Sequence, residues 1–442
     1  MPIQTQHPQY AAHKLQWQKC RDCYEGEDAV KEAGILYLPK LSIVQTVSEY
    51  ASYKARGYFY EVVPRTISGL VGAATRKRAT IEGPDEIVEM ATPNIIREII
   101  RELLITGRCS LLVDMPLVPS DRSYLAVRTA EQVINWRDED GKLILVVMSE
   151  TREAVNPQDE YDIKVETWFR ELKIEGGQYV INLYRPKGDS VWELAETITP
   201  RASNKNLGFI PFTFTTPRGI TETITQPPIL GLANANLWHY RHSADYSHGL
   251  HYTGLPTPWV SGHNTKVDED GGIINDLQIG SGTAWLLEAG GSAGYLEFTG
   301  QGLTALQQAL ADMESRMALI GARLLESSKR AAEAAETVRL RQSAESATLI
   351  NVVTAAGDAL EQALTQAAQW LGLSQEVSVE MNTDFVSDRL EAADIIALIQ
   401  ALQVGGMSLD TFIYNLAAGE ILPPDRTVED EKLLIADGQV PV

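Results

Sequence analysis

The chain has 442 residues and a mass of 48.7 kDa, enough for two or three domains of about 150 residues each. With 44% hydrophobic and 22% charged residues, its composition excludes a largely disordered or fibrous protein. The net charge of −21 argues against a broad basic face for tight binding of nucleic acid, so any contact with DNA must be local or weak.

Neither a membrane span nor a secretory signal is expected. The longest unbroken apolar run, residues 143–148, is far shorter than the stretch of about 20 residues that crosses a bilayer. The N-terminus has neither a basic nor an apolar region, which predicts a cytosolic protein. Cys20, Cys23 and Cys109 are too few for a disulfide framework, and the single Cys-x-x-Cys pair lacks a second pair of zinc ligands. We therefore expect no cofactor and no bound metal.

Helical periodicity dominates the first hundred residues. Residues 9–33 have the apolar spacing of one amphipathic helix, and residues 44–74 predict two more. A strongly amphipathic helix follows over residues 93–107, and the apolar run 109–114 reads as a short strand.

The period then changes to that of strands between about residues 125 and 199. Asp140-Gly141 and Gly176-Gly177 are hairpin signals, because such turns require a positive φ. The segment therefore predicts an antiparallel β subdomain, and the fold class is α+β. The predicted strands are residues 143–149, 161–171, 178–184, 191–198 and, after the subdomain, 210–215.

Two helices separated by an insertion come next. Residues 229–252 are helical, and residues 259–299 are rich in glycine, with short strands predicted at 283–288 and 295–298. The helix after the insertion carries apolar residues at alternating spacings of three and four, which is a heptad stripe for packing against another helix. The residues of this stripe are Leu303, Leu306, Leu310, Met313, Met317, Ile320 and Leu324.

The last part of the chain is helical and acidic. If residues 302–371 formed one helix it would be on the order of 100 Å long, so we predict a kink or loop near Ser327. A strand is expected at 376–382, followed by a helical module from residue 389. Residues 391–442 contain nine acidic and two basic residues, a net charge of 2 − 9 = −7.

Two groups of residues could carry chemistry. Five of the seven histidines lie in residues 239–263, and the spacing of His239 and His242 puts them on one helix face. A metal-dependent hydrolase is one interpretation, although a carboxylate partner of the HExxH kind is missing; packing of the histidines with tyrosine and tryptophan at an interface is the other. The second group is a net-positive island around Lys329 and Arg330, either an ion-paired helix surface or a loop that touches phosphates. No Walker A motif occurs in the chain.

The order of these elements resembles that of the portal proteins of tailed bacteriophages. The resemblance covers nearly the whole chain, and none of its stretches is catalytic. The stretches that carry it are Tyr58-Phe-Tyr60 with Arg65 to Gly72, Leu104 to Gly107 with Leu111 to Asp114, and Leu232 to Gly262.

The resemblance implies a portal-type architecture with an α/β wing, a two-helix stem, a small α/β clip insertion, a long kinked alanine-rich helix and a helical crown. The implied wing comprises residues 1–225, the long helix 336–371 and a strand segment 372–388. Residues 226–253 and 302–325 would form the stem, 254–301 the clip, 326–335 the tunnel loop and 389–442 the crown.

The family function implied is that of a ring, usually of about twelve copies, at one capsid vertex. Double-stranded DNA would be packaged and ejected through its axis, with weak, non-specific contacts at Lys329 and Arg330 of the tunnel loop. Implied partners are the terminase large subunit, a head–tail adaptor protein, the major capsid protein and a scaffold. Such a protein is no enzyme and belongs to the virion, assembled in the bacterial cytoplasm. Another virion ring, an adaptor or a capsid scaffold would share the heptads and the acidity.

Overall fold

We describe the fold from a computed structural model of the chain. The residues it describes are 2–114, 123–156, 159–188, 191–202, 205–254, 257–261, 266–267, 273–274, 287, 289–296, 301–325, 335–383, 385, 392–403, 406–418, 421 and 428–436.

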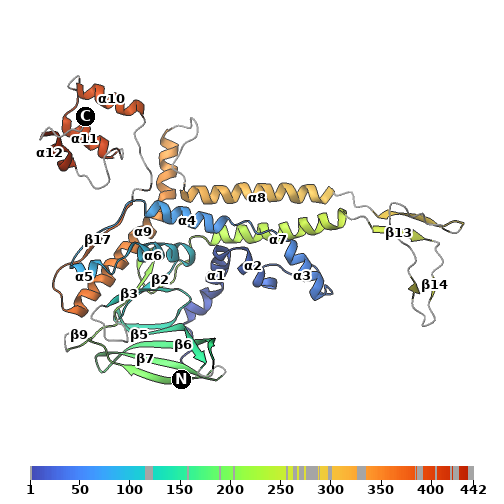
Figure 1. Ribbon diagram of the computed structural model, residues 1–442, viewed down its shortest axis with the longest axis horizontal. Helices are drawn as coiled ribbons and strands as arrows, with labels where there is room; N and C mark the ends of the chain where they lie inside the picture. The colour runs from blue at the N-terminus through green and yellow to red at the C-terminus, as the bar shows by residue number, and fades with distance from the viewer. Residues whose placement is uncertain are drawn as a thin grey trace.

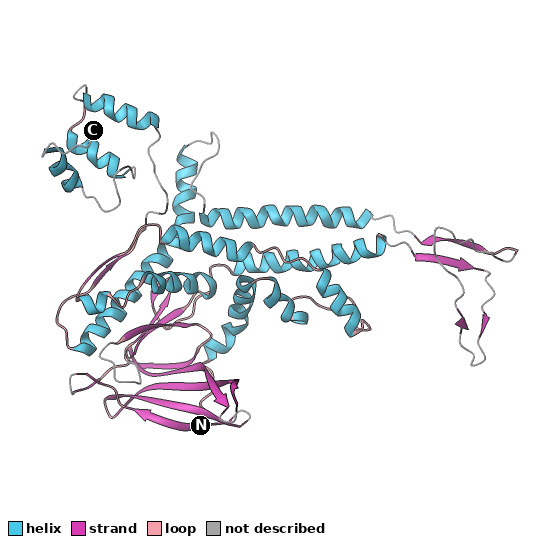
Figure 2. Cartoon of the chain, in the orientation of Figure 1, coloured by secondary structure: helices cyan, strands magenta, loops and turns pink. Residues whose placement is uncertain are grey.

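The chain forms an α/β body, a long two-helix arm that projects from it, and a set of C-terminal helices that stands apart (Figure 1). The C-terminal helices are α10 (Ala392–Gln403), α11 (Leu409–Ala418) and α12 (Val428–Ala436). Helices and antiparallel strands are mixed within the body, as the α+β class predicts (Figure 2). Among the described residues, no helix is both long and apolar enough to cross a membrane.

Six helices precede the sheets, and their ends follow local chemistry. Thr46 forms a capping box with Glu49 at the start of α3, Thr92 caps α6, and Gly107 ends α6 with a φ of 69°. The prediction of one helix over residues 9–33 was wrong, because Gly26 has a φ of 102° and breaks it into two. The helices are α1 (Pro8–Glu25), α2 (Glu27–Glu32), α3 (Val47–Arg56), α4 (Val62–Ala74), α5 (Asp85–Val88) and α6 (Pro93–Thr106).

Two larger sheets form most of the described β part of the body. The first has the strand order β12-β11-β2-β3 and the second the order β4-β5-β6-β7-β8, and every pairing is antiparallel. Asp140, Gly141, Gly176 and Gly177 have positive φ, as the hairpin signals predict. The strands are β2 (Cys109–Asp114), β3 (Tyr124–Thr129), β4 (Val133–Glu139), β5 (Lys142–Asn156), β6 (Asp159–Glu175), β7 (Gln178–Gly188), β8 (Val191–Ile198), β11 (Phe212–Thr216) and β12 (Gly219–Ile220).

Helix α9 (Ala335–Leu371) joins the first sheet to the helices. Its alanines allow close approach, and the backbone oxygen of Ala355 accepts a hydrogen bond from Thr215 Oγ1 of β11 at 3.2 Å. Strand β17 (Ser378–Glu380) follows and pairs with β1 (Thr80–Glu82), almost 300 residues away. The buried residues that α9 contributes to the core are Leu349, Val352, Val353, Ala356, Ala359, Leu360, Ala363, Leu364, Ala367, Ala368 and Trp370.

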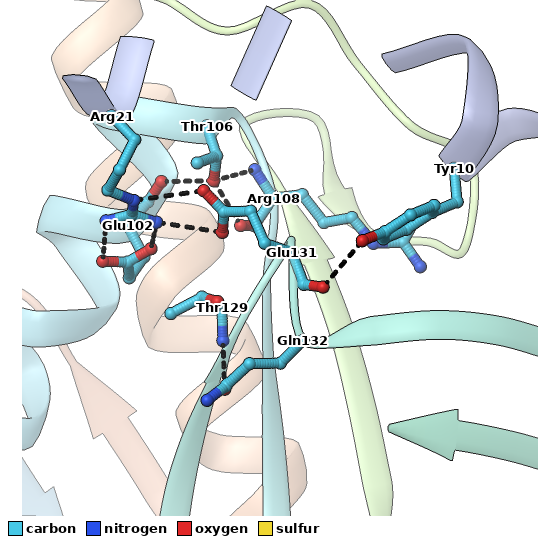
Figure 3. Close-up of polar contacts among 8 residues, drawn as sticks. All are labelled: Tyr10, Arg21, Glu102, Thr106, Arg108, Thr129, Glu131 and Gln132. Carbon is cyan, nitrogen blue, oxygen red and sulfur yellow. Dashed lines mark hydrogen bonds and ion pairs between the residues drawn. The ribbon is translucent and has the colours of Figure 1, made fainter. Parts of the chain in front are cut away.

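A buried ion-pair network ties α1 to α6 and to the turn before β4 (Figure 3). Arg21 binds the two carboxylate oxygens of Glu102 at 2.8 and 2.6 Å and those of Glu131 at 3.1 and 3.0 Å. Burial by itself would lower the pKa of Arg21, but the bonds and charge of Glu102 and Glu131 raise it above its usual value. The guanidinium therefore stays charged and holds three elements together.

Arg108 is a second buried cation, at the start of β2. Its guanidinium lies 4.2 Å from the ring centre of Trp136 and 4.3 Å from that of Phe214, and Nη1 donates a hydrogen bond to the Glu222 backbone oxygen at 2.7 Å. Burial lowers the pKa of Arg108, and the two neighbouring aromatic faces compensate part of the cost of burying its charge.

We predict that Arg21→Gln lowers the free energy of unfolding by about 3 kcal/mol, because it leaves the buried carboxylate of Glu102 without its counter-charge. Denaturant titration of the purified chain measures this. The matched control is Arg185→Gln, which breaks an exposed ion pair with Glu193 and should leave stability unchanged within error. An equal loss in both variants would contradict the role given to Arg21.

A further ion-pair cluster is centred on Glu150, in the second sheet. Its carboxylate binds Arg170 Nε at 2.8 Å, Arg152 Nη2 at 2.9 Å and Arg128 Nη2 at 3.2 Å, and Arg170 also bonds to Asp114 of β2. Burial alone would raise the pKa of Glu150, but the arginines outweigh it and the net shift is downward. The cluster links the two sheets through paired charges.

A depressed pKa gives a pH dependence with a defined sign. The cluster's contribution is complete above the ordinary glutamate pKa of 4.5 and is lost as the pH falls through the lower, folded-state value. We predict that the difference in unfolding free energy between the wild type and Glu150→Gln is largest above about pH 5 and shrinks below it. Denaturant titrations from pH 7 to 3 measure it, and a difference that grows toward low pH would contradict the assignment.

Candidate functional site: a projecting two-helix arm

The arm consists of α7 (Leu230–Thr253), which leaves the body, and α8 (Gln301–Leu325), which returns to it alongside (Figure 1). Strands β13 (Thr257–Ser261) and β16 (Ser292–Leu296) pair antiparallel at the far end, and β14 (Lys266–Val267) pairs with β15 (Ile273–Ile274) (Figure 2). The predicted strand at 283–288 falls almost entirely outside the described residues, and that at 295–298 overlaps the end of β16.

The first half of α7 is embedded in the body. Asn236 Nδ2 donates to the backbone oxygen of Tyr60 at 2.8 Å, Ser243 Oγ accepts from the Tyr58 N–H at 3.0 Å, and Arg241 Nε donates to the Tyr37 backbone oxygen at 2.6 Å. The buried residues of this half are Leu230, Leu232, Ala233, Asn236, Leu237, His239, Tyr240, Ser243 and Ala244. No described residue of α7 after Ala244 is buried, so that half belongs to the projecting part.

The heptad stripe of α8 is only partly buried. Met317, near the body, is fully buried, whereas Leu303, Leu306, Leu310, Met313 and Ile320 are half-buried. Leu303 lies against Gly249 of α7, where any added Cβ would meet its side chain. The structure does not describe the side chain of Leu324. Residues 326–334, which include Lys329 and Arg330, also lie outside the described part of the chain.

The histidines of α7 pack with aromatic rings. His242 stacks on Trp238 with ring centres 3.7 Å apart, and His248 contacts the edges of Tyr53 at 5.3 Å and Tyr252 at 4.8 Å. Buried His239 lies 3.1 Å from Glu314 of α8, measured from Nε2 to Oε1, and so connects the two helices of the arm. His263 is outside the described residues, and within the described part no three His, Cys, Asp or Glu side chains are grouped as a metal site requires. The imidazoles of His242 and His248 therefore contact aromatic rings of the same chain.

Two ionisable groups where α3 packs against α7, Tyr53 of α3 and His248 of α7, are shifted toward their neutral forms. Burial raises the pKa of Tyr53. The hydrogen bond that the Tyr53 hydroxyl donates to Asp245 Oδ1, at 2.6 Å, raises it further. Burial lowers the pKa of His248, and the nearby charge of Arg56 lowers it further. Neutral rings at these positions suit packing better than proton transfer.

An ordered loop beside the arm exposes apolar side chains, and sequence reasoning missed it. Ile43, Val44 and Val47 are 98%, 79% and 83% exposed. The Val44 N–H donates to Ser42 Oγ at 3.3 Å and the Leu41 N–H to Gln45 Oε1 at 3.1 Å, so hydrogen bonds within the loop hold its shape. The sequence signal that could have indicated this loop is the group of apolar residues after Pro39, which lacks the periodicity of a helix. In the single chain these three apolar side chains are left in contact with water.

Comparison with known proteins matches part of the chain to a family. Residues 228–371, which span the arm and α9, match a family model described as "Domain of unknown function (DUF4055)". No curated protein matches the sequence.

Two solved structures contain similar chains. One, from "Virion of native gene transfer agent (GTA) particle", is 13% identical with a TM-score of 0.39, and the alignment covers 89% of this chain and 99% of that one. The other, from "Neck of empty GTA particle computed with C6 symmetry", is 15% identical with a TM-score of 0.38, covering 83% of this chain and 91% of that one.

The contact between Gly57 and Tyr240 of α7 allows a test of how closely α7 packs against the body. A Cβ at Gly57 would lie 2.8 Å from Cε2 of buried Tyr240, so Gly57→Ala should lower stability by about 1–3 kcal/mol. Gly72→Ala, within α4, meets nothing within 4 Å and should raise stability by about 0.5–1 kcal/mol. Thermal unfolding of both variants measures the pair, and a stabilised Gly57→Ala would contradict the close contact.

Proposed function

We propose that the protein is a ring-forming component of a phage-like virion, and specifically a portal protein through which double-stranded DNA is packaged and ejected. The observation that carries the proposal is the arm, in which two antiparallel helices leave an α/β body and end in a small β insertion. That arrangement supports the proposal because it agrees with the stem and clip that the portal-like order of the sequence implies.

Exposed apolar surface supports assembly from several copies. The loop around Ile43 and Val44 lies beside the arm, and Leu250 and Tyr252 are exposed on the outer half of α7. A single copy leaves these groups in water, whereas neighbouring copies around an axis would cover them. In this proposal residues 226–253 and 302–325 line up with the corresponding helices of adjacent copies.

The charge of the chain suits a channel for DNA. With a net charge of −21 on each copy, a ring repels phosphates and lets the duplex slide, because every phosphate contact adds affinity that must be overcome in transport. We propose Lys329 and Arg330 as the few attractive contacts. Terminase, a head–tail adaptor, the major capsid protein and a scaffold are the proposed partners at the capsid vertex.

Assembly is tested by measuring the mass of the purified chain with native mass spectrometry. We expect a closed ring of about a dozen copies for the wild type. Val44→Asp should give a folded monomer, because it places a charge where neighbouring copies exclude water. The control Val165→Asp changes a valine that is 71% exposed on β6 and should leave the ring intact. Loss of the ring in both variants, or in neither, would contradict the assignment of the loop.

Contacts with DNA are tested by the salt dependence of binding to a short duplex. Removing two phosphate contacts with Lys329→Gln and Arg330→Gln should make the slope of log K against log salt shallower by about 2 for each copy whose loop contacts the duplex. Arg185→Gln with Lys187→Gln removes two exposed cations of β7 and is expected to change nothing. An unchanged slope in the loop variant would refute the assigned contacts.

A further inference from the structure

The hairpin of β5 and β6 extends beyond the rest of its sheet. Strand β4 pairs with β5 only as far as Met148, and β7 pairs with β6 only from Phe169 onward, whereas β5 and β6 remain paired past both points. The extended part, residues 151–156 and 159–168, is a two-stranded ribbon, which we call the β5–β6 ribbon. Its sheet lies on the side of the body away from α8, so the arm leaves the ribbon uncovered (Figure 1).

One edge of the ribbon has no neighbouring strand in the described part of the chain. If the register of β6 with β7 continued, Pro186 would lie opposite Thr167, and proline has no N–H to donate. The backbone oxygen of Thr167 instead accepts a hydrogen bond from Trp192 Nε1 of β8 at 2.8 Å. In an antiparallel pair every second residue points its N–H and C=O away from the partner strand. Residues 159–166 of β6 therefore present backbone donors and acceptors along an edge that no described strand pairs with.

One face of the ribbon is apolar and exposed. Tyr161, Ile163 and Val165 alternate along β6 and therefore share a face, where they are 86%, 52% and 71% exposed. The opposite face is partly covered by the ribbon's own side chains, since the guanidinium of Arg152 lies 4.5 Å from the ring centre of Trp168. The apolar face is thus the one that gains from being covered by another molecule.

The charge of the ribbon selects among possible occupants. Residues 151–168 contain five acidic and two basic residues, a net charge of 2 − 5 = −3. Glu153, which pairs with Val165, is exposed beside the apolar side chains. A second copy of the chain would bring the same acidic strand to this edge and be repelled. An occupant with a net positive charge is attracted both by the ribbon and by the whole chain, whose net charge is −21.

We propose that the open edge of β6 binds an extended, positively charged segment of another protein, which adds to the sheet as a further strand. Backbone hydrogen bonds to residues 159–166 supply affinity, as in other cases of strand addition. Apolar side chains at every second position of the segment continue the face formed by Tyr161, Ile163 and Val165. The site needs only one copy of the chain, so it does not depend on the proposed ring.

Binding of a synthetic peptide to the full-length chain tests the proposal. The probe is a fluorescent heptapeptide in which four valines alternate with three lysines, and the control peptide has the same composition with the four valines first and the three lysines last. We expect the alternating peptide to bind at least about tenfold more tightly by fluorescence anisotropy, because only it can place all valines on one face of a strand. Hydrogen exchange followed by mass spectrometry should slow at residues 159–168 when that peptide is bound, and not with the control peptide.

Matched variants separate the ribbon from the rest of the acidic surface. Val165→Thr removes an apolar contact without changing the charge and should weaken binding of the alternating peptide by about fivefold. Val191→Thr changes a valine that is 53% exposed on β8 and should leave binding unchanged.

Four results would overturn the proposal. They are equal binding of the two peptides, slowed exchange only outside residues 159–168, equal loss of affinity in the two variants, and protection of residues 159–168 that grows with protein concentration before any peptide is added. The last result would put a second copy on the edge. Each of these results can be read whether or not the chain forms a ring, so the proposed function is judged separately.

Discussion

Burial of the first half of α7 is the constraint on which the arm depends. A 24-residue helix cannot hold a direction in water by itself, and α7 is fixed because Leu232, Leu237 and Tyr240 are packed inside the body. Gly57 and Gly321 allow the close approach, the first of Tyr240 to the chain before α4 and the second of α8 to Thr66 of α4. The free halves of α7 and α8 then project together and carry the β insertion outward (Figure 2).

Charge is distributed in two ways that fit the proposed channel. Inside the body, cations are matched closely, as with Arg21 between Glu102 and Glu131 and with Arg170 beside Glu150. On the surface, acidic residues are in excess and cations gather at a few places, of which a cavity lined by Arg78 and Arg97 is one. Paired charges add rigidity without attracting DNA, while the acidic excess keeps phosphates at a distance.

Much of the fold was predictable because its signals are local. Hairpin turns at Asp140-Gly141 and Gly176-Gly177 depend on positive φ, which glycine supplies, and the heptad spacing from Leu303 onward sets one face of α8. The strand predicted at 376–382 contains β17, but its pairing with β1 was out of reach, because β1 has three residues and carries no pattern of its own. The same holds for Arg21: its position in α1 gives no sign of partners on α6 and before β4.

The histidine-rich stretch shows what sequence spacing leaves open. Pairs three residues apart do share a helix face, which made a metal site a reasonable hypothesis. In the structure the imidazoles are instead occupied by rings and by the other helix, as with His242 on Trp238 and His239 beside Glu314. The contact of His239 with α8 depends on how the two helices pack, and that information lies in tertiary structure.

The most direct test of the account is an electron cryo-microscopy reconstruction of the purified, assembled protein. The account predicts a closed ring with a central hole, in which the α7–α8 arms of neighbouring copies stand side by side and their β insertions meet at one end. A compact monomer or dimer, with the arms isolated in solvent or folded back onto the body, would contradict it.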